Sequence, residues 1–221
     1  MTTFLLFIIA IAAYLLGAIN GAIIASKYIF KKDIRNYGSH NAGLTNFYRV
    51  FGVPGVALLL AIDVLKTVFA VLIGYWLLGM CGTADVKTGY NFYAEVGLLF
   101  AGFCAMLGHS YPVYYGLRGG KGALCAGVIA LSANFFLGLV CIAAFAVVLV
   151  LTRYVSLASL IGAALFPLGL WIGGFGGALP GVVGLFCFLL IAFQHRENIV
   201  RLIHHKEPKF DFKARPKRFG E

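Results

Sequence analysis

The sequence predicts an all-α integral membrane protein with seven transmembrane helices. Of its 221 residues, 61% are hydrophobic and only 12% are charged, and the mean hydropathy is +0.92. Soluble proteins carry about a quarter charged residues, whereas a membrane-spanning helix needs about 20 predominantly apolar residues. Most of the chain is therefore expected to lie in a lipid bilayer, with its polar residues confined to short connecting segments.

The first apolar run covers residues 2–26 and is followed by Lys27, Lys31, Lys32 and Arg35. A secretory signal peptide has the opposite polarity, with basic residues ahead of roughly 7–15 apolar ones. Because Lys and Arg tend to remain on the cytoplasmic side, we interpret this run as an uncleaved anchor with its N-terminus outside.

Four further apolar runs follow, at residues 53–79, 92–108, 122–152 and 155–194. The last run is long enough for two spans and divides at Gly173–Gly177. The run 122–152 is long for one span and short for two. The distribution of Lys and Arg in the segment that follows the last run decides how many times the run 122–152 crosses the membrane. That segment, 195–221, carries eight Lys and Arg residues, and the positive-inside tendency places such a C-terminus in the cytoplasm.

A cytoplasmic C-terminus requires the run 122–152 to break near Ser132–Asn134 into two short helices, which gives seven spans. The polar segments then share one cytoplasmic face that holds 16 of the 18 Lys and Arg residues. We predict a single membrane domain at residues 1–205 and a basic cytoplasmic tail at 206–221. The net charge of +10 is scattered over short loops, so the bilayer rather than nucleic acid is the expected partner.

Polar residues gather on this face in three clusters: Tyr37–Arg49, Gly119–Gly122 and His195–Asn198. Glycines let backbone N–H groups approach an oxyanion, Lys and Arg supply charge, and Ser, Thr, Asn and His supply directional hydrogen bonds. We interpret the three clusters as one anion site, with chemistry that involves phosphate esters beside lipid.

Each cluster also has a plainer interpretation, as turn chemistry or as a basic turn at the membrane surface. In Gly119–Gly122, however, the glycines run into the start of a helix, whose free N–H groups and positive dipole end favour an anion. Lys121 adds a full charge there. Because Lys121 stands where a GxxxxGK[ST] loop requires glycine, nucleotide hydrolysis is not predicted.

Two pairs of polar residues are spaced i, i+3 on predicted helices and so share a helix face. His195 and Asn198 follow the last span, where they can point into the bundle. Asp63 and Lys66 lie inside the second span. Ionisable groups within a membrane are functional by default, but this second pair can also neutralise itself as a structural bridge, and the sequence leaves both interpretations open.

In this order, the clusters resemble the bacterial acyl-phosphate:glycerol-3-phosphate acyltransferase family. The resemblance rests on four motifs and extends over essentially the whole chain: Gly38–Asn46 with Arg49, Gly108–Pro112 with Gly119–Gly122, Arg153–Ser159, and His195–Asn198. His40 and Ala42 depart from the family pattern, in which Gly and Pro are common at these positions.

The resemblance implies transfer of a fatty acyl group from acyl phosphate to the sn-1 hydroxyl of glycerol 3-phosphate. The products would be lysophosphatidic acid and phosphate, formed on the cytoplasmic side of the bacterial inner membrane. The resemblance assigns catalytic roles in binding glycerol 3-phosphate to Ser39, Arg49, Lys121, His195 and Asn198. It places Thr45, Gly119, Gly120 and Ser159 in the acyl-phosphate pocket, supported by Asn41, Asn46 and Ser156.

The alternative is a small membrane transporter of phosphate esters or lipids, which would also combine helices with a basic mouth. Transporters commonly contain internal repeats, and we find no convincing repeat. Acyl transfer by a His/Asp dyad is not predicted, since none of the five His residues is followed five residues later by Asp. The Cys and His spacing matches no metal site, so we expect no metal or other cofactor, and we expect a monomer.

Overall fold

The structure is a computed structural model that describes residues 1–87, 89–173 and 178–212. Within these residues every regular element is a helix, which confirms the all-α class. The α-helices are α1 (Thr2–Gly17), α2 (Gly21–Phe30), α3 (Leu44–Phe51), α4 (Val56–Gly79), α5 (Phe92–Ser110), α6 (Ala123–Ala133), α7 (Phe135–Thr152), α8 (Val155–Ile172), α9 (Ala178–Gln194) and α10 (Arg196–Ile203). Two 3-10 turns, η1 (Ile34–Asn36) and η2 (Val113–Tyr115), lie in the loops.

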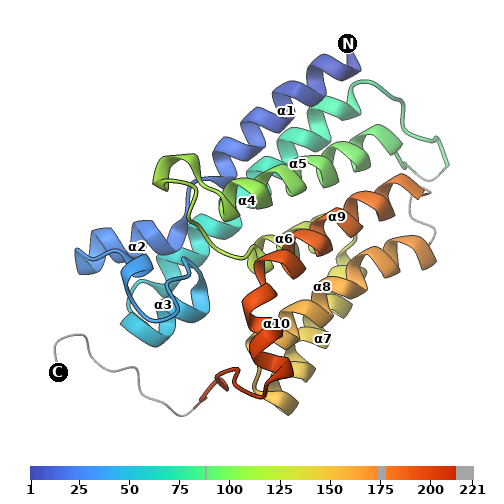
Figure 1. Cartoon of the computed structure of the whole chain (residues 1–221). Helices are drawn as coiled ribbons and strands as arrows, with labels where there is room; N and C mark the ends of the chain where they lie inside the picture. The colour runs from blue at the N-terminus through green and yellow to red at the C-terminus, as the bar shows by residue number, and fades with distance from the viewer. Residues whose placement is uncertain (88, 174–177, 213–221) are drawn as a thin grey trace.

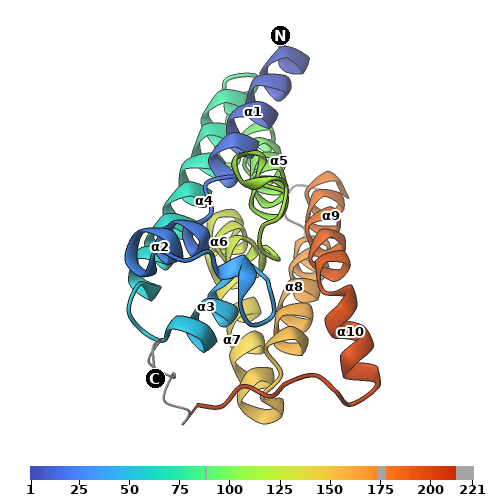
Figure 2. The same cartoon turned by 60° about the vertical axis from the view of Figure 1, so that its left-hand side comes forward.

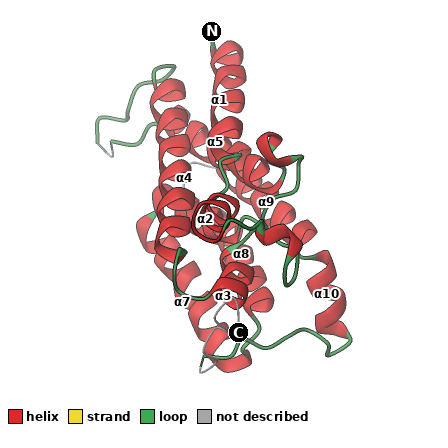
Figure 3. Ribbon diagram, turned by 90° about the vertical axis from the view of Figure 1, so that its left-hand side faces the viewer, coloured by secondary structure: helices red, strands yellow, loops and turns green. Residues whose placement is uncertain are grey.

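The long helices pack as two groups with α6 between them (Figure 1). Helices α1, α4 and α5 form one group and α7, α8 and α9 the other, while α6 contacts members of both. Figure 2 shows the start of α1 at one end of the molecule and α3 and α10 toward the other. Figure 3 looks along α2, with α3 beneath it and α10 to the side. The loops that carry the polar clusters therefore lie away from the N-terminus.

Five helical segments are long and apolar enough to cross a membrane. They are Thr2–Phe30, Val56–Gly79, Phe92–Tyr115, Phe135–Thr152 and Val155–Ile172. Helix α9 passes the same test together with α10, from which it is bent by 63°. Helix α6, with 11 residues, is shorter than a span.

The run 122–152 breaks where the sequence predicts it. Helix α6 ends at Ala133, and Asn134 takes an extended conformation from which its side chain accepts a hydrogen bond of 2.9 Å from the Leu137 N–H group. Asn at this position is a strong N-cap, so one residue both ends α6 and starts α7. The prediction of two short helices is wrong for α7, because the cap consumes a single residue and leaves 18 for the helix.

The first apolar run, predicted as an anchor at residues 2–26, contains a break between two helices. Helix α1 ends at Gly17, and Asn20 caps α2 by accepting from the Ile23 N–H group at 3.0 Å. The Asn20 side chain also donates to the carbonyl of Ala42 at 3.2 Å, which ties this break to the first polar cluster. The other expected break falls partly on residues 174–177, which lie outside the described residues, as do residues 213–221 of the tail.

Asp63 and Lys66 stabilise the break between α1 and α2. Both side chains are almost fully buried, and Lys66 Nζ lies 2.7 Å from Asp63 Oδ1. Lys66 donates to the carbonyl of Ile19 at 2.6 Å and to His109 Nδ1 at 2.9 Å, while Asp63 accepts from the Gly21 N–H group at 3.0 Å. A helix break leaves backbone groups that need partners, so these contacts support the structural interpretation of the pair.

Candidate active site

The second and third polar clusters meet through Lys121 and Asn198. Lys121 precedes α6, whose N-cap Gly122 has a φ of +81° and carries no capping side chain. The Lys121 ammonium donates to the side-chain oxygen of Asn198, which is buried on α10. A charged group at an uncapped helix start, held by a buried amide, is a favourable place for an anion.

Glu207 is a central residue of this site, although the sequence pattern indicates only that it belongs to the basic tail. Its buried carboxylate accepts hydrogen bonds from Asn198 Nδ2 at 2.6 Å and Ser156 Oγ at 2.7 Å. Its second oxygen accepts from Arg201 Nε at 2.7 Å. Burial alone would raise the pKa of Glu207, but the three hydrogen bonds lower it below the usual value. An acidic residue among the basic ones of the tail was the available sequence signal.

Residues 204–212, the C-terminal segment, bring Glu207 into the site by crossing from α10 toward α3. The Phe210 N–H group donates to the carbonyl of Arg153 at 2.7 Å, and the Phe210 ring lies 5.9 Å from that of Tyr48. Arg49, the neighbour of Tyr48 on α3, is exposed and lies within the electrostatic field of Glu207 and Arg201. The first polar cluster therefore borders the other two.

Asn46 organises the first cluster. It is buried, and its side-chain oxygen accepts from the Ser39 N–H group at 2.9 Å. Its side-chain nitrogen donates to the carbonyls of Tyr37 and Asn41, each at 3.0 Å. These bonds occupy the Asn46 amide in holding the loop together, which fits a supporting role rather than contact with a ligand. Ser39 is exposed, while Asn41 and Thr45 are half-buried.

The glycine loop corrects one expectation about its backbone. The N–H groups of Gly119 and Gly120 were expected to face an anion, but they donate to the carbonyls of Ser110 and His109 at 3.1 and 3.0 Å. The last carbonyls of α5 lack partners within the helix, and the loop folds back to supply them. A Cβ on Gly120 would lie 2.2 Å from His109 Nε2, so glycine is required for this packing. Lys121 and the start of α6 remain for an anion.

Ser156 and Ser159 lie near the start of α8 and share one of its faces. Ser156 binds Glu207, whereas the Ser159 hydroxyl donates to the carbonyl of Val155 at 2.9 Å. Both residues are buried. Ser159 thus lies beside the polar network without a contact that joins it to Glu207.

The protonation states in the site follow from burial. His195, at the junction of α9 and α10, is 4% exposed, and burial lowers its pKa to about 4. Its Nδ1 lies 2.9 Å from the carbonyl of Ile191; a carbonyl can only accept, so Nδ1 carries the proton and Nε2 is an acceptor. Burial also lowers the pKa of Lys121, to about 8. At neutral pH the site thus combines a neutral imidazole with a charged ammonium.

The sequence profile that describes glycerol-3-phosphate acyltransferases matches residues 7–205 of the chain. The chain belongs to the glycerol-3-phosphate acyltransferase family. A glycerol-3-phosphate acyltransferase of Thermoanaerobacter pseudethanolicus is 40% identical over 210 residues, which cover 93% of this chain and 96% of the relative. One of Clostridioides difficile is 37% identical, covering 95% and 97%.

Solved structures of the same family share the fold. The crystal structure of PlsY, an integral membrane glycerol 3-phosphate acyltransferase, in its glycerol 3-phosphate form superposes with a TM-score of 0.79 at 31% identity, covering 93% of this chain and 96% of PlsY. Its lysophosphatidic acid form gives a TM-score of 0.78 at 30% identity. This acyltransferase is therefore an integral membrane enzyme, and the transporter alternative is set aside.

Proposed function

We propose that this acyltransferase moves a fatty acyl group from acyl phosphate to the sn-1 hydroxyl of glycerol 3-phosphate, giving lysophosphatidic acid and phosphate. The observation that carries the proposal is the contact of Lys121 with Asn198 beside His195, Ser156 and Glu207. The glycerol 3-phosphate and lysophosphatidic acid forms of PlsY support the acceptor and the product.

In this proposal Ser39, Arg49, Lys121, His195 and Asn198 bind glycerol 3-phosphate. Thr45, Gly119, Gly120 and Ser159 line the pocket for acyl phosphate, and Asn41, Asn46 and Ser156 support the two groups. Both substrates are anions that repel each other when brought together. Lys121 and Arg49 offset that repulsion, and holding the reactants in contact removes much of the entropic barrier.

The acyl transfer needs no base from the protein. The sn-1 oxygen attacks the acyl carbonyl carbon, the bond from that carbon to the phosphate oxygen breaks, and the departing phosphate takes the hydroxyl proton. A mixed anhydride is already an activated acyl donor. His195 then positions the substrate, because its Nε2 can accept a hydrogen bond from the sn-2 hydroxyl of glycerol 3-phosphate, whose proton is not transferred.

Replacing His195 with glutamine tests this role. We expect His195→Gln to raise the KM for glycerol 3-phosphate while keeping turnover within about tenfold of wild type, because an amide can replace the hydrogen bond but cannot take up a proton. The measurement is the pH–rate profile of the variant. Loss of turnover by several orders of magnitude, together with loss of the acid-side limb that a base with a pKa of about 4 would give, would restore a base role.

The proposed reaction is tested with purified protein in detergent. Phosphate release from acyl phosphate should depend on glycerol 3-phosphate, and lysophosphatidic acid should appear in equal amount. Neither acyl-CoA nor acylated acyl carrier protein, supplied in place of acyl phosphate, should give product. Product from either thioester, but none from acyl phosphate, contradicts the proposed donor.

We further propose the topology of a monomer in the bacterial inner membrane. It has seven spans, namely the α1–α2 segment and each of α4 to α9, with the N-terminus outside. Residues 1–205 form the membrane domain, and the active site and the tail 206–221 are cytoplasmic. Helix α6 is short for a bilayer but is surrounded by other helices, and backbone at membrane depth is tolerated where protein covers it.

Cysteine labelling in intact cells tests the topology. In a background in which the free, partly exposed Cys81 is replaced by serine, we expect Asn36→Cys and Arg196→Cys, both at exposed positions, to resist a membrane-impermeant maleimide until the membrane is permeabilised. Lys87→Cys, in the loop between α4 and α5, should react at once. Asn36 and Arg196 on opposite sides of the bilayer would contradict a shared site.

A further inference from the structure

The two loops that supply Ser39 and Lys121 belong to distant parts of the chain. A backbone hydrogen bond of 3.3 Å joins them, from the Ala42 N–H group to the carbonyl of Gly119. A single long hydrogen bond fixes the separation of two loops poorly. A stronger connection is made by Arg35, four residues before Ser39.

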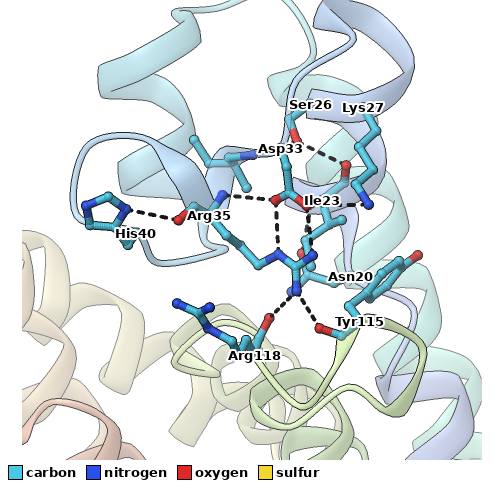
Figure 4. Close-up of polar contacts among 10 residues, drawn as sticks. Asn20, Ile23, Ser26, Lys27, Asp33, Arg35, His40, Tyr115 and Arg118 are labelled. Atoms are coloured by element: carbon cyan, nitrogen blue, oxygen red, sulfur yellow. Dashed lines mark hydrogen bonds and ion pairs between the residues drawn. The ribbon is translucent and has the colours of Figure 1, made fainter.

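Arg35 lies in η1 and reaches from the first loop to the second (Figure 4). Its Nε and Nη2 donate to the two carboxylate oxygens of Asp33 at 3.0 and 2.8 Å. Its Nη1 donates to the carbonyl of Tyr115 and, at 3.4 Å, to the carbonyl of Arg118. Arg118 directly precedes Gly119, so the guanidinium holds the entrance of the glycine loop.

Asp33 holds the guanidinium in this orientation. The hydrogen bond from Arg35 is the main reason why the pKa of Asp33 falls to about 2, and Lys27 lies 3.4 Å from the same carboxylate. Asp33 in turn raises the pKa of Arg35. The pair therefore stays ionised at neutral pH. A planar fork that bonds a carboxylate on one edge and carbonyls on the other cannot be replaced by lysine, which is a point charge.

The backbone of Arg35 also acts on the Ser39 turn. Its carbonyl oxygen lies 3.0 Å from His40 Nδ1, and His40 has a φ of +58°, which non-glycine residues adopt rarely. The imidazole thus supplies a contact that favours this conformation. Arg35 orders the turn through its carbonyl and the glycine loop through its side chain.

We infer that Arg35 is a positioning residue that sets the separation of the Ser39 turn from Lys121. The inference rests on the proposed function, in which both loops bind the same glycerol 3-phosphate. Arg35 itself does not contact the substrate. Its removal should loosen both loops, weaken acceptor binding and leave the helical bundle intact.

The test compares full-length Arg35→Ala and Arg35→Lys with wild type in detergent. We expect the KM for glycerol 3-phosphate to rise about tenfold in both variants, with a smaller change in kcat, since misplacement of a substrate-binding group weakens ground-state and transition-state contacts together. Methylguanidinium should restore part of the activity of Arg35→Ala but none of that of Arg35→Lys, whose side chain fills the space. The matched control is Lys31→Gln, which removes an exposed positive charge from the same loop and should behave as wild type.

Hydrogen exchange of the backbone amides provides a readout independent of activity. In Arg35→Ala, exchange should accelerate in residues 37–49 and 113–122 and remain unchanged in α4, α5 and α8. Unchanged exchange in the two loops, or faster exchange with an unchanged KM, would overturn the inference. Faster exchange throughout the molecule would show that Arg35 stabilises the whole fold instead. If wild type itself released no phosphate with glycerol 3-phosphate, the proposed function would fail, while the exchange data would still decide whether Arg35 joins the loops.

Discussion

Replacing Lys121 with alanine is expected to lower kcat/KM for glycerol 3-phosphate by about a hundredfold to a thousandfold. Removal of one preorganised electrostatic group from an active site has an effect of that order. Lys121 supplies the charge at the start of α6, and its loss also leaves the buried side-chain oxygen of Asn198 without its ammonium donor. An unsatisfied buried acceptor adds to the loss.

The measurement is release of phosphate from acyl phosphate with and without glycerol 3-phosphate. Lys87→Ala is the matched control. It removes a lysine that is exposed in the loop between α4 and α5 and should leave kcat and the KM for glycerol 3-phosphate unchanged. Undiminished activity of Lys121→Ala, at equal amounts of folded protein, would mean that the anion is bound elsewhere.

The pH dependence of wild type offers a second readout of the same residue. Burial lowers the pKa of Lys121 to about 8, so the free enzyme carries this charge below pH 8 and loses it above. We expect kcat/KM for glycerol 3-phosphate to fall as the pH rises through that value, because kcat/KM reports the ionisation of the free enzyme. Lys121→Arg, whose charge persists, should lack this limb at whatever activity it retains.

Local signals in the sequence predicted much of the fold. Charge asymmetry required a break near Ser132–Asn134, and Asn134 makes it by capping α7. Gly122 ends the glycine loop and α6 follows at once, as the composition indicates. The Asn134 cap and the start of α6 at Gly122 are made by residues close together in the chain, whereas the need for a break was indicated by the positive charge of residues 195–221.

Contacts between distant segments could not be predicted in this way. The break at Asn20 lies within an apolar stretch of sequence, and the residues that stabilise it, Asp63 and Lys66, are on α4. The packing of Gly120 against His109 likewise depends on how the loop meets α5. In each case the residue type fitted several roles, and only its neighbours in space distinguish them.

In the candidate site, too, local features could be predicted from the sequence, whereas contacts between distant segments could not. Lys121, His195 and Asn198 were identified because charged and polar residues interrupt apolar runs, and the structure places Lys121 against Asn198. Glu207 was missed because eight basic residues dominate the composition of the segment that contains it. Its partners Ser156 and Asn198 lie 51 and 9 residues away, so its role appears only when α8, α10 and the C-terminal segment are assembled.

Replacing Glu207 with glutamine is therefore expected to destabilise the protein and the site together. Three donors, from Ser156, Asn198 and Arg201, converge on the carboxylate. A glutamine amide keeps one acceptor oxygen, but its NH2 group faces Arg201, which is itself a donor and loses its nearer carboxylate partner. The Glu207 carboxylate is buried but the Arg201 side chain is 38% exposed, so the cost comes mainly from the buried donors that lose a full partner. That cost is about 2 kcal/mol, which corresponds to a fall in melting temperature of about 4 to 8 °C for a chain of this size.

The sign of the pH effect follows from the lowered pKa of Glu207. Its contribution to stability is present above the usual carboxyl range and is lost as the pH falls through the value in the folded protein. The difference in melting temperature between wild type and Glu207→Gln should thus become smaller in acid. The matched control is Glu197→Gln, because Glu197 also faces Arg201, at 4.0 Å, but its side chain is 76% exposed. Exposed pairs contribute little, so this variant should melt within about 1 °C of wild type. Equal melting temperatures for the two variants would show that the C-terminal segment does not hold the site together.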